Sequence, residues 1–189
     1  MLLNESAQFD LAQRLRLKTV PLGEVFSFLS GLYFRGKLAY AKTFAKPPPG
    51  LPGTFIITTN RGLLDANTPV GLKQLEAFSK VDIDENEPRY RRPLLRAAKR
   101  ICKSFTEPCE VVLLGSVATG KYVDVLQGIF GERLRFPLEF VGRGDMSRGG
   151  LMLRCAADGT ELEYISLKGA ARHGKRPEKL VPRRYPKES

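Results

Sequence analysis

Residues 111–122 read VVLLGSVATGKY, and this stretch decides the fold class. Its first four residues are apolar and predict a buried strand. Residues 115–122 match the phosphate-loop pattern G-x-x-x-x-G-K-[ST] at every position except the last, where Tyr122 stands in place of Ser or Thr. The sequence YVDVLQGIF then predicts a helix over about residues 121–129. A strand, a glycine-containing turn and a helix in this order indicate an α/β domain.

The first half of the chain predicts further helices and strands. Residues 23–30 and 33–45 have helical patterns separated near Gly31, and KPPPGLPG (46–53) predicts a stiff connection because proline lacks a backbone donor. TFIITTN (54–60) is apolar and β-branched, which predicts a buried strand. Thr68 followed by Pro69 predicts the start of another helix.

The second half is expected to complete the sheet. LRFPLEFVG (134–142) predicts a strand at an edge or a bulge, because it contains Pro137. LMLRCAADGTELEYISL (151–167) predicts a β-hairpin about Asp158-Gly159, which suits a type I′ turn. We therefore expect a single three-layer α/β domain over residues 1–167, with a mixed sheet and this C-terminal β-hairpin. A flexible basic tail, residues 168–189, is expected to follow.

The positive charge is concentrated in two segments. The net charge is +11; the tail holds eight basic and two acidic residues, and residues 89–103 hold seven basic residues and no acidic one. Concentration of this kind predicts binding to a polyanion, namely nucleic acid. The alternative is a solvated helix face and a disordered tail. The tail residues predicted to bind nucleic acid are Arg172, Lys175, Arg176, Arg183 and Arg184.

Residues 91–105 predict an amphipathic helix with two stripes. Leu94, Ala98, Ile101 and Phe105 recur at spacings of 4, 3 and 4, which predicts a face toward the core. The same spacing relates four cations, which form a second stripe predicted to bind nucleic acid: Arg92, Arg96, Lys99 and Lys103.

The glycine loop after the 111–114 strand is a candidate phosphate site. Its glycines would let backbone N–H groups point at an anion, and the following helix would direct its positive dipole end toward that anion. Tyr122 cannot supply the aliphatic hydroxyl that ligates Mg²⁺, which argues against a nucleoside triphosphatase. We predict an anion loop, with a ligand-free structural turn as the alternative. The predicted phosphate-binding residues are Gly115, Ser116, Thr119, Gly120 and Lys121.

A second glycine-rich loop, GRGDMSRGG (142–150), carries charged side chains. Guanidinium groups on a flexible backbone suit bidentate binding of phosphate, so Arg143, Ser147 and Arg148 are predicted to bind it. Asp145 is the candidate catalytic residue, because a carboxylate there could orient an arginine, bind a ribose hydroxyl or act as a base. The alternative is a surface loop in which Asp145 pairs with its neighbours. We expect the two glycine loops to meet around one anionic ligand.

Several classes of function are disfavoured. No run of about 18 apolar residues is present, so no membrane span is expected. Glu5 and Asp10 do not suit a signal peptide, and three cysteines without C-x-x-C spacing suit a reduced, cytoplasmic protein. His173 is the only histidine and lies in the tail, so neither a metal site nor a cofactor is predicted.

Four segments carry a resemblance to known proteins. FSFLSGLYFRGKLAYA, IITTNRGLL, LLGSVATGKY and GRGDMSRGG resemble a family of uncharacterised bacterial proteins of this length, over about residues 24–155. This resemblance implies no activity and no residue roles. The positions of Tyr33, Asn60-Arg61-Gly62 and Gly115-Ser116 are also similar to α/β domains that handle nucleosides or bases in DNA and RNA modification, without assigning a catalytic residue.

The sequence thus predicts a cytoplasmic α/β protein that binds a nucleotide or a nucleic-acid phosphate. Whether it is also an enzyme acting on a nucleoside or nucleic acid is left open. One alternative is a non-enzymatic nucleic-acid-binding module that uses the basic helix and tail. Another is a small-ligand enzyme whose tail binds nothing.

Overall fold

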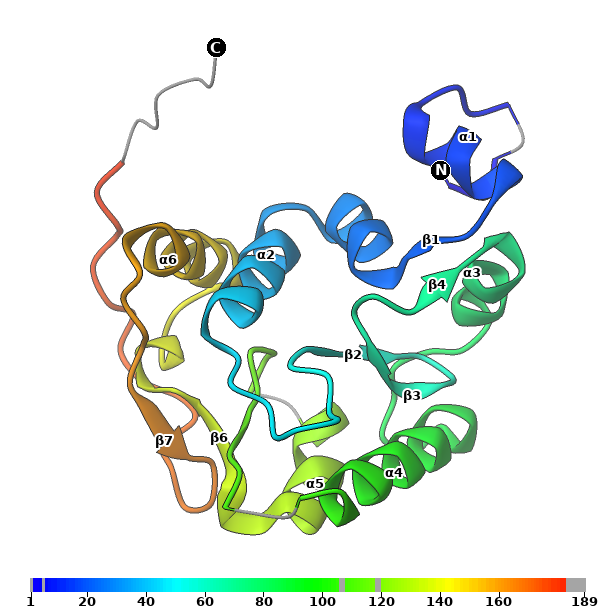
Figure 1. Cartoon of the computed structure of the whole chain (residues 1–189). Coiled ribbons are helices and arrows are strands. Elements are labelled where there is room, and N and C mark those ends of the chain that lie inside the picture. Colours follow the sequence, from blue (N-terminus) through cyan, green and yellow to red (C-terminus); the bar gives the residue numbers. More distant parts are fainter. Residues whose placement is uncertain (1, 5, 106–107, 118–119, 183–189) are drawn as a thin grey trace.

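A computed structural model describes residues 2–4, 6–105, 108–117 and 120–182. Its helices are α1 (Asp10–Leu17), α2 (Leu22–Phe44), α3 (Leu72–Ser79), α4 (Pro88–Lys103), α5 (Gly120–Phe130) and α6 (Asp145–Asp158), with 3₁₀ turns η1 (Gly131–Arg133) and η2 (Leu138–Phe140). Its strands are β1 (Val20–Pro21), β2 (Phe55–Thr58), β3 (Gly62–Asp65), β4 (Pro69–Val70), β5 (Val111–Val112), β6 (Leu134–Pro137) and β7 (Tyr164–Ser166). The mixture of helices and small sheets fits an α/β type of fold (Figure 1).

The strands of the described residues form three small sheets where the sequence predicted one. β1 pairs with β4, and β2 forms an antiparallel hairpin with β3. The third sheet has the order β5-β6-β7 and is mixed, because β6 runs parallel to β5 and antiparallel to β7. Strand β5 and helix α5 confirm the predicted strand and helix on either side of the first glycine loop, of which residues 118–119 lie outside the described residues.

Helix α2 is bent and packs along α6 (Figure 1). The bend is at Gly31, whose φ of 61° is outside the helical region, so the predicted break is confirmed. Past the bend, α2 and α6 cross closely, because a Cβ added at Gly36 would lie 2.5 Å from the carbonyl oxygen of Gly149. Two glycines at one crossing thus let the backbones approach to a distance that side chains would prevent.

The predicted C-terminal hairpin is wrong. Residues 145–158 form α6, and Gly159 ends that helix with a φ of 65°. Aspartate followed by glycine suits both structures, because the I′ turn and the helix C-cap each need a residue at positive φ. The 142–150 segment is likewise mostly the first turns of α6 and only partly a loop.

The helix predicted to start at Thr68-Pro69 begins later. Pro69 lies in β4, where it pairs with Pro21 of β1 at a short two-stranded edge that needs no proline donor. Helix α3 starts after Gly71, whose backbone N–H donates to the side chain of Gln74 at 3.0 Å. Helix α3 therefore begins three residues later than the sequence predicts.

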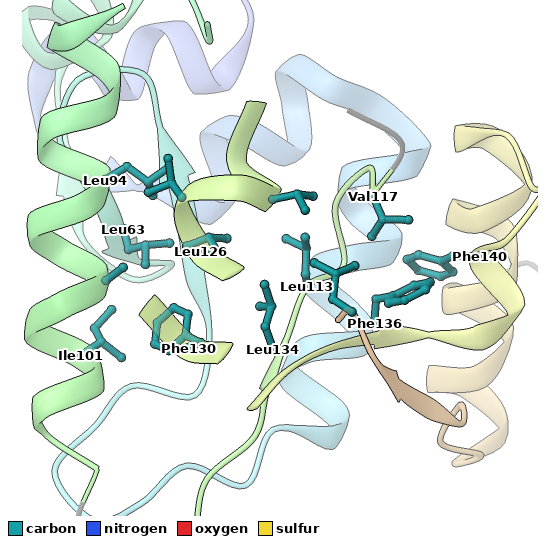
Figure 2. Close-up of a cluster of buried hydrophobic side chains, with 14 of the residues drawn as sticks. Leu63, Leu94, Ile101, Leu113, Val117, Leu126, Phe130, Leu134, Phe136 and Phe140 are labelled. Carbon is teal, nitrogen blue, oxygen red and sulfur yellow. The ribbon is translucent and has the colours of Figure 1, made fainter. Parts of the chain in front are cut away.

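The main core lies between α4, α5 and the mixed sheet. Figure 2 shows its labelled side chains, which include Leu94 and Ile101 of α4, Phe130 of α5 and Phe136 of β6. The predicted apolar stripe of α4 is confirmed for Leu94, Ala98 and Ile101, which are buried, and Phe105 is partly buried against them. A second cluster joins α1, α3 and the first half of α2. No helix in the described ranges is both long and apolar enough to cross a membrane.

Candidate functional site

The amino end of α6 gathers most of the residues predicted in the second glycine loop. The first helical hydrogen bond of α6 runs from the N–H of Arg148 to the carbonyl of Gly144 at 3.0 Å, so the amides of residues 145–147 precede it. Arg148 and Gly149 are buried toward α2. Ser147, Gly150 and Arg154 line a surface pocket with the C-terminal segment. The helix end therefore has two chemically different faces.

The face toward α2 holds a group of polar side chains that we call the tyrosine–arginine cluster: Tyr33, Lys37, Tyr122, Asp145 and Arg148. Arg148 is 6% exposed, donates to the carbonyl of Phe140 at 3.0 Å and lies 3.8 Å from a carboxylate oxygen of Asp145. Its Nε has no hydrogen-bond partner among the described residues. The hydrogen-bonding capacity of the buried Arg148 guanidinium is therefore only partly satisfied by the described residues.

Tyr33 and Lys37 lie one helical turn apart on α2. The Nζ of Lys37 sits 3.8 Å from the centre of the Tyr33 ring, a cation–π arrangement. Burial lowers the pKa of Lys37 to about 8; nearby Asp145 acts to raise this pKa, and Arg148 lowers it further. Burial also raises the pKa of Tyr33 to about 12, although a hydrogen bond with Arg148 acts in the opposite direction. Near neutral pH, Tyr33 is thus a neutral hydroxyl and Lys37 an amine that loses its proton readily.

Tyr122 folds back over the first glycine loop. A Cβ added at Gly115 would lie 3.3 Å from the Tyr122 ring. The hydroxyl of Tyr122 forms a hydrogen bond with the backbone of Ser116, while burial raises the pKa of this hydroxyl. The residue that departs from the phosphate-loop pattern therefore bonds to the loop that would cradle a phosphate.

The amino end of α5 already has carboxylates beside it. A Cβ added at Gly120 would lie 2.6 Å from a carboxylate oxygen of Asp124 and 2.6 Å from one of Glu85. These negative charges suit the positive end of the helix dipole and would repel a phosphate there. Lys121 is exposed and forms no ion pair with a described residue, and Thr119 lies outside the described residues.

The two predicted glycine segments lie close together, and aromatic side chains join them. The hydroxyl of Tyr33 donates to the carbonyl of Leu114 at 3.3 Å and also bonds with Arg148 of α6. Val117 is fully buried in the core cluster that includes Phe140, and Figure 2 shows these two side chains near each other. The structure thus brings Ser116, Asp145 and Arg148 into one neighbourhood, whereas Gly120 and Lys121 follow on α5.

The other face of α6 lines a surface pocket of about 320 Å³. Four cations and one acidic residue contribute to its wall, namely Arg143, Arg154, Arg176, Lys179 and Glu178. Arg143 donates to the Ser147 hydroxyl at 3.2 Å, and its buried Nε has no partner among the described residues. Of the predicted phosphate-binding residues, Arg143 and Ser147 line this pocket, and Arg148 belongs to the cluster on the opposite face.

The described part of the tail packs along α6 (Figure 1). Arg143 and Arg154 donate to the backbone carbonyls of Glu178 and Val181. The chain passes so close to Gly142 that a Cβ there would clash with the carbonyl oxygen of Lys175. Arg176 and Lys175 are exposed and Arg172 is half-buried, whereas Arg183 and Arg184 lie outside the described residues.

The predicted cationic stripe of α4 forms a separate surface. Arg92, Arg96, Lys99 and Lys103 are all exposed, and none forms an ion pair with a described residue. Figure 1 shows α4 and the C-terminal segment on opposite sides of the molecule. The basic helix and the basic tail therefore do not form one continuous surface.

Tyr33 and Lys37 belong to GLYFRGKLAYA (31–41), whose interleaved aromatic and basic residues could stack on a base and hold its phosphate, but the sequence favoured a core helix with solvated cations there. Tyr122, Arg154 and Lys179 were not among the predicted site residues. A sequence signal exists for the first pair, because an aromatic residue and a lysine four positions apart share a helix face. No group of three or more histidine, cysteine, aspartate and glutamate side chains suited to a metal occurs within the described ranges.

Comparisons of the chain with protein-family models, with curated proteins and with solved structures find no match. The function must therefore be argued from the two faces of α6 and from the α4 surface.

Proposed function

We propose that this protein binds the phosphate of a nucleotide or nucleic acid in the pocket at the amino end of α6. The observation that carries the proposal is the charge of the pocket wall, where Arg143, Arg154, Arg176 and Lys179 face a single acidic residue, Glu178. Planar guanidinium groups match the oxygens of a phosphate, and the first-turn amides of a helix favour an anion. The volume of about 320 Å³ is enough for a small ligand.

The pocket differs from the one that the sequence predicted. Its second wall comes from residues 176–180 of the tail, and the first glycine loop does not contribute. The tail would then form part of the binding site in addition to carrying positive charge. We place this binding in the cytoplasm, where the three cysteines, which form no disulfide with one another, would stay reduced.

Binding is expected to raise the melting temperature of the protein in the presence of a nucleoside triphosphate or a short oligonucleotide. Replacing Arg143 or Arg176 by glutamine should weaken binding about 10- to 100-fold, because each removes a charge-assisted hydrogen bond. The melting temperature measured across a ligand titration gives the affinity. Arg61→Gln is the matched control, since Arg61 is exposed on the β2–β3 turn and makes the same charge change.

Unchanged affinity in both pocket variants would refute the proposed site. An equal loss in the Arg61 variant would show that only net charge matters. Either result would mean that the pocket is a solvated cleft that does not bind phosphate specifically.

A second candidate function is a non-enzymatic module that holds nucleic acid along α4. The observation that favours it is the row of four exposed cations, opposite the buried face of the helix, that form no ion pair with any described residue: Arg92, Arg96, Lys99 and Lys103. Such a surface binds phosphates without reading sequence, and its affinity depends steeply on salt.

A further inference from the structure

Residues 174–181 of the tail, which we call the strap, are anchored against the loop that precedes α6. Gly142 of that loop has a φ of 72°, and a Cβ there would lie 2.9 Å from the carbonyl oxygen of Gly174 and would clash with that of Lys175. A Cβ on Gly174 would in turn lie 2.7 Å from a methyl carbon of Val141. Glycine on both sides of this crossing therefore lets the two segments of chain come into contact.

Beyond this crossing, side chains hold the strap along α6 (Figure 1). Arg143 donates to the carbonyl of Glu178 at 3.5 Å, and Arg154 donates to that of Val181. Within the described ranges, no backbone N–H of the strap donates to another backbone group. Ala170, four residues before the strap, still packs against the main core. The strap is thus a segment that can open at a lower free energy than the core to which it is attached.

The pocket places like charges on both sides of this contact. The wall formed by α6 and the loop before it carries Arg143 and Arg154, and the strap carries Arg176 and Lys179. Glu178 is the single acidic residue of the described lining, so the two walls repel each other. An anion between the walls offsets this repulsion and accepts hydrogen bonds from both of them. The docked position of the strap is therefore favoured when an anion is present.

We propose that the strap closes over the bound phosphate, so that phosphate binding and strap docking stabilise each other. A guanidinium group has five N–H donors, so Arg143 and Arg154 can hold the strap and the phosphate together. While the strap is open the site is incomplete, because Arg176 and Lys179 are then withdrawn from it. This coupling rests on the proposed function, whereas the anchoring of the strap at Gly142 does not.

The test is limited proteolysis with trypsin, in which mass spectrometry follows cleavage of the bond after Lys179. The fraction of molecules with an open strap sets the rate of this cleavage. A nucleoside triphosphate at ten times its Kd, taken from the melting titration, should slow the cleavage about tenfold, because it binds only the closed form. Cleavage after Lys18, which is exposed at the end of α1, reveals any direct effect of the nucleotide on trypsin.

Gly142→Ala tests the anchor itself. Its Cβ would displace the strap, so the bond after Lys179 should be cleaved about tenfold faster than in the unmodified protein, and the nucleotide affinity should fall about tenfold. Gly159→Ala is the matched control, because Gly159 has a similar φ of 65° and an added Cβ there meets no atom within 4 Å. Gly174→Ala puts the clash on the strap and gives the same test if Gly142→Ala does not fold.

Each outcome decides between the strap and the phosphate site. Slower cleavage with nucleotide, and faster cleavage in the Gly142 variant, support the coupled strap. A nucleotide that raises the melting temperature without slowing the cleavage overturns the coupling and leaves the phosphate site standing. If no nucleotide binds, the proposed function fails and the coupling fails with it. Equal cleavage of the Gly142 and Gly159 variants shows that the strap is not anchored, and it overturns the inference whatever the binding test shows.

Discussion

Replacing Gly149 by alanine is expected to lower the free energy of unfolding by about 2–3 kcal/mol, because the new methyl group overpacks the α2–α6 crossing. A Cβ at this position would lie 2.8 Å from the Cα of Tyr33 and 3.0 Å from the carbonyl oxygen of Leu32. Both contacts are with backbone atoms, which cannot rotate away. The helices would have to separate, and the close crossing of α2 and α6 would loosen.

Gly150→Ala is the matched control for this prediction. It lies in the same helix, and a Cβ there would meet only the side chain of Leu180 at 3.7 Å, an ordinary contact distance. Because alanine is the better helix former, this variant should gain about 0.5–1 kcal/mol. Urea unfolding followed by circular dichroism measures both values. Equal stability of the Gly149 and Gly150 variants would contradict the close crossing.

Neutralising the α4 stripe is expected to have the largest effect on nucleic-acid binding, if nucleic acid lies along α4. Replacing Arg92, Arg96, Lys99 and Lys103 by glutamine should reduce the slope of log affinity against log salt by about 3–4, since each contacted phosphate releases nearly one counterion. At low salt the affinity should fall by a factor of about 100 or more. Fluorescence anisotropy of a labelled oligonucleotide across a salt series gives the slope.

The control is a second quadruple variant with the same change of net charge. Lys18, Lys42, Lys73 and Lys80 are exposed lysines on other elements, and they too can be replaced by glutamine. An equal loss of slope in this control would mean that net charge alone acts, and that α4 is not a docking surface. An intact slope in the α4 variant would favour the α6 pocket.

Local features of the fold followed from local sequence. The stripes of α4 could be predicted because apolar and cationic residues repeat with the helical period over residues 92–105. The bend of α2 at Gly31 followed from the permissive backbone of glycine. Both features depend on residues near one another in the chain.

The amino-terminal part of α6 could not be predicted in this way. Four glycines in residues 142–150 indicate a loop by intrinsic propensity, and tertiary packing reverses this preference. Gly149 lies in α6 at the point where the backbone of α2 packs against it, and a larger residue would clash there. Helix α2 is more than 100 residues earlier in the sequence, so this contact cannot be read from the local sequence. The turn signal at Asp158-Gly159 was real but marks the end of a helix.

The candidate site could be predicted from the sequence only in part, for the same reason. The second glycine loop stood out because charged and polar side chains rarely occur so close together in a short glycine-rich segment. These side chains are Arg143, Asp145, Ser147 and Arg148. Their division into two faces depends on which side of α6 meets α2 and which meets the tail. The role of Tyr122 also needed coordinates, because the sequence does not show that its hydroxyl bonds to the backbone of Ser116 in the preceding loop.

The central claim, that a phosphate binds at the amino end of α6, is tested most directly by NMR. Amide and arginine Nε–H signals of the ¹⁵N-labelled protein would be followed while inorganic phosphate, and then a nucleoside triphosphate, is added. We expect the shifts to concentrate at the amides of residues 144–147, at Arg143 Nε and at residues 176–179. Shifts confined to Gly115–Lys121 or to α4, or no saturable shift at all, would contradict the account.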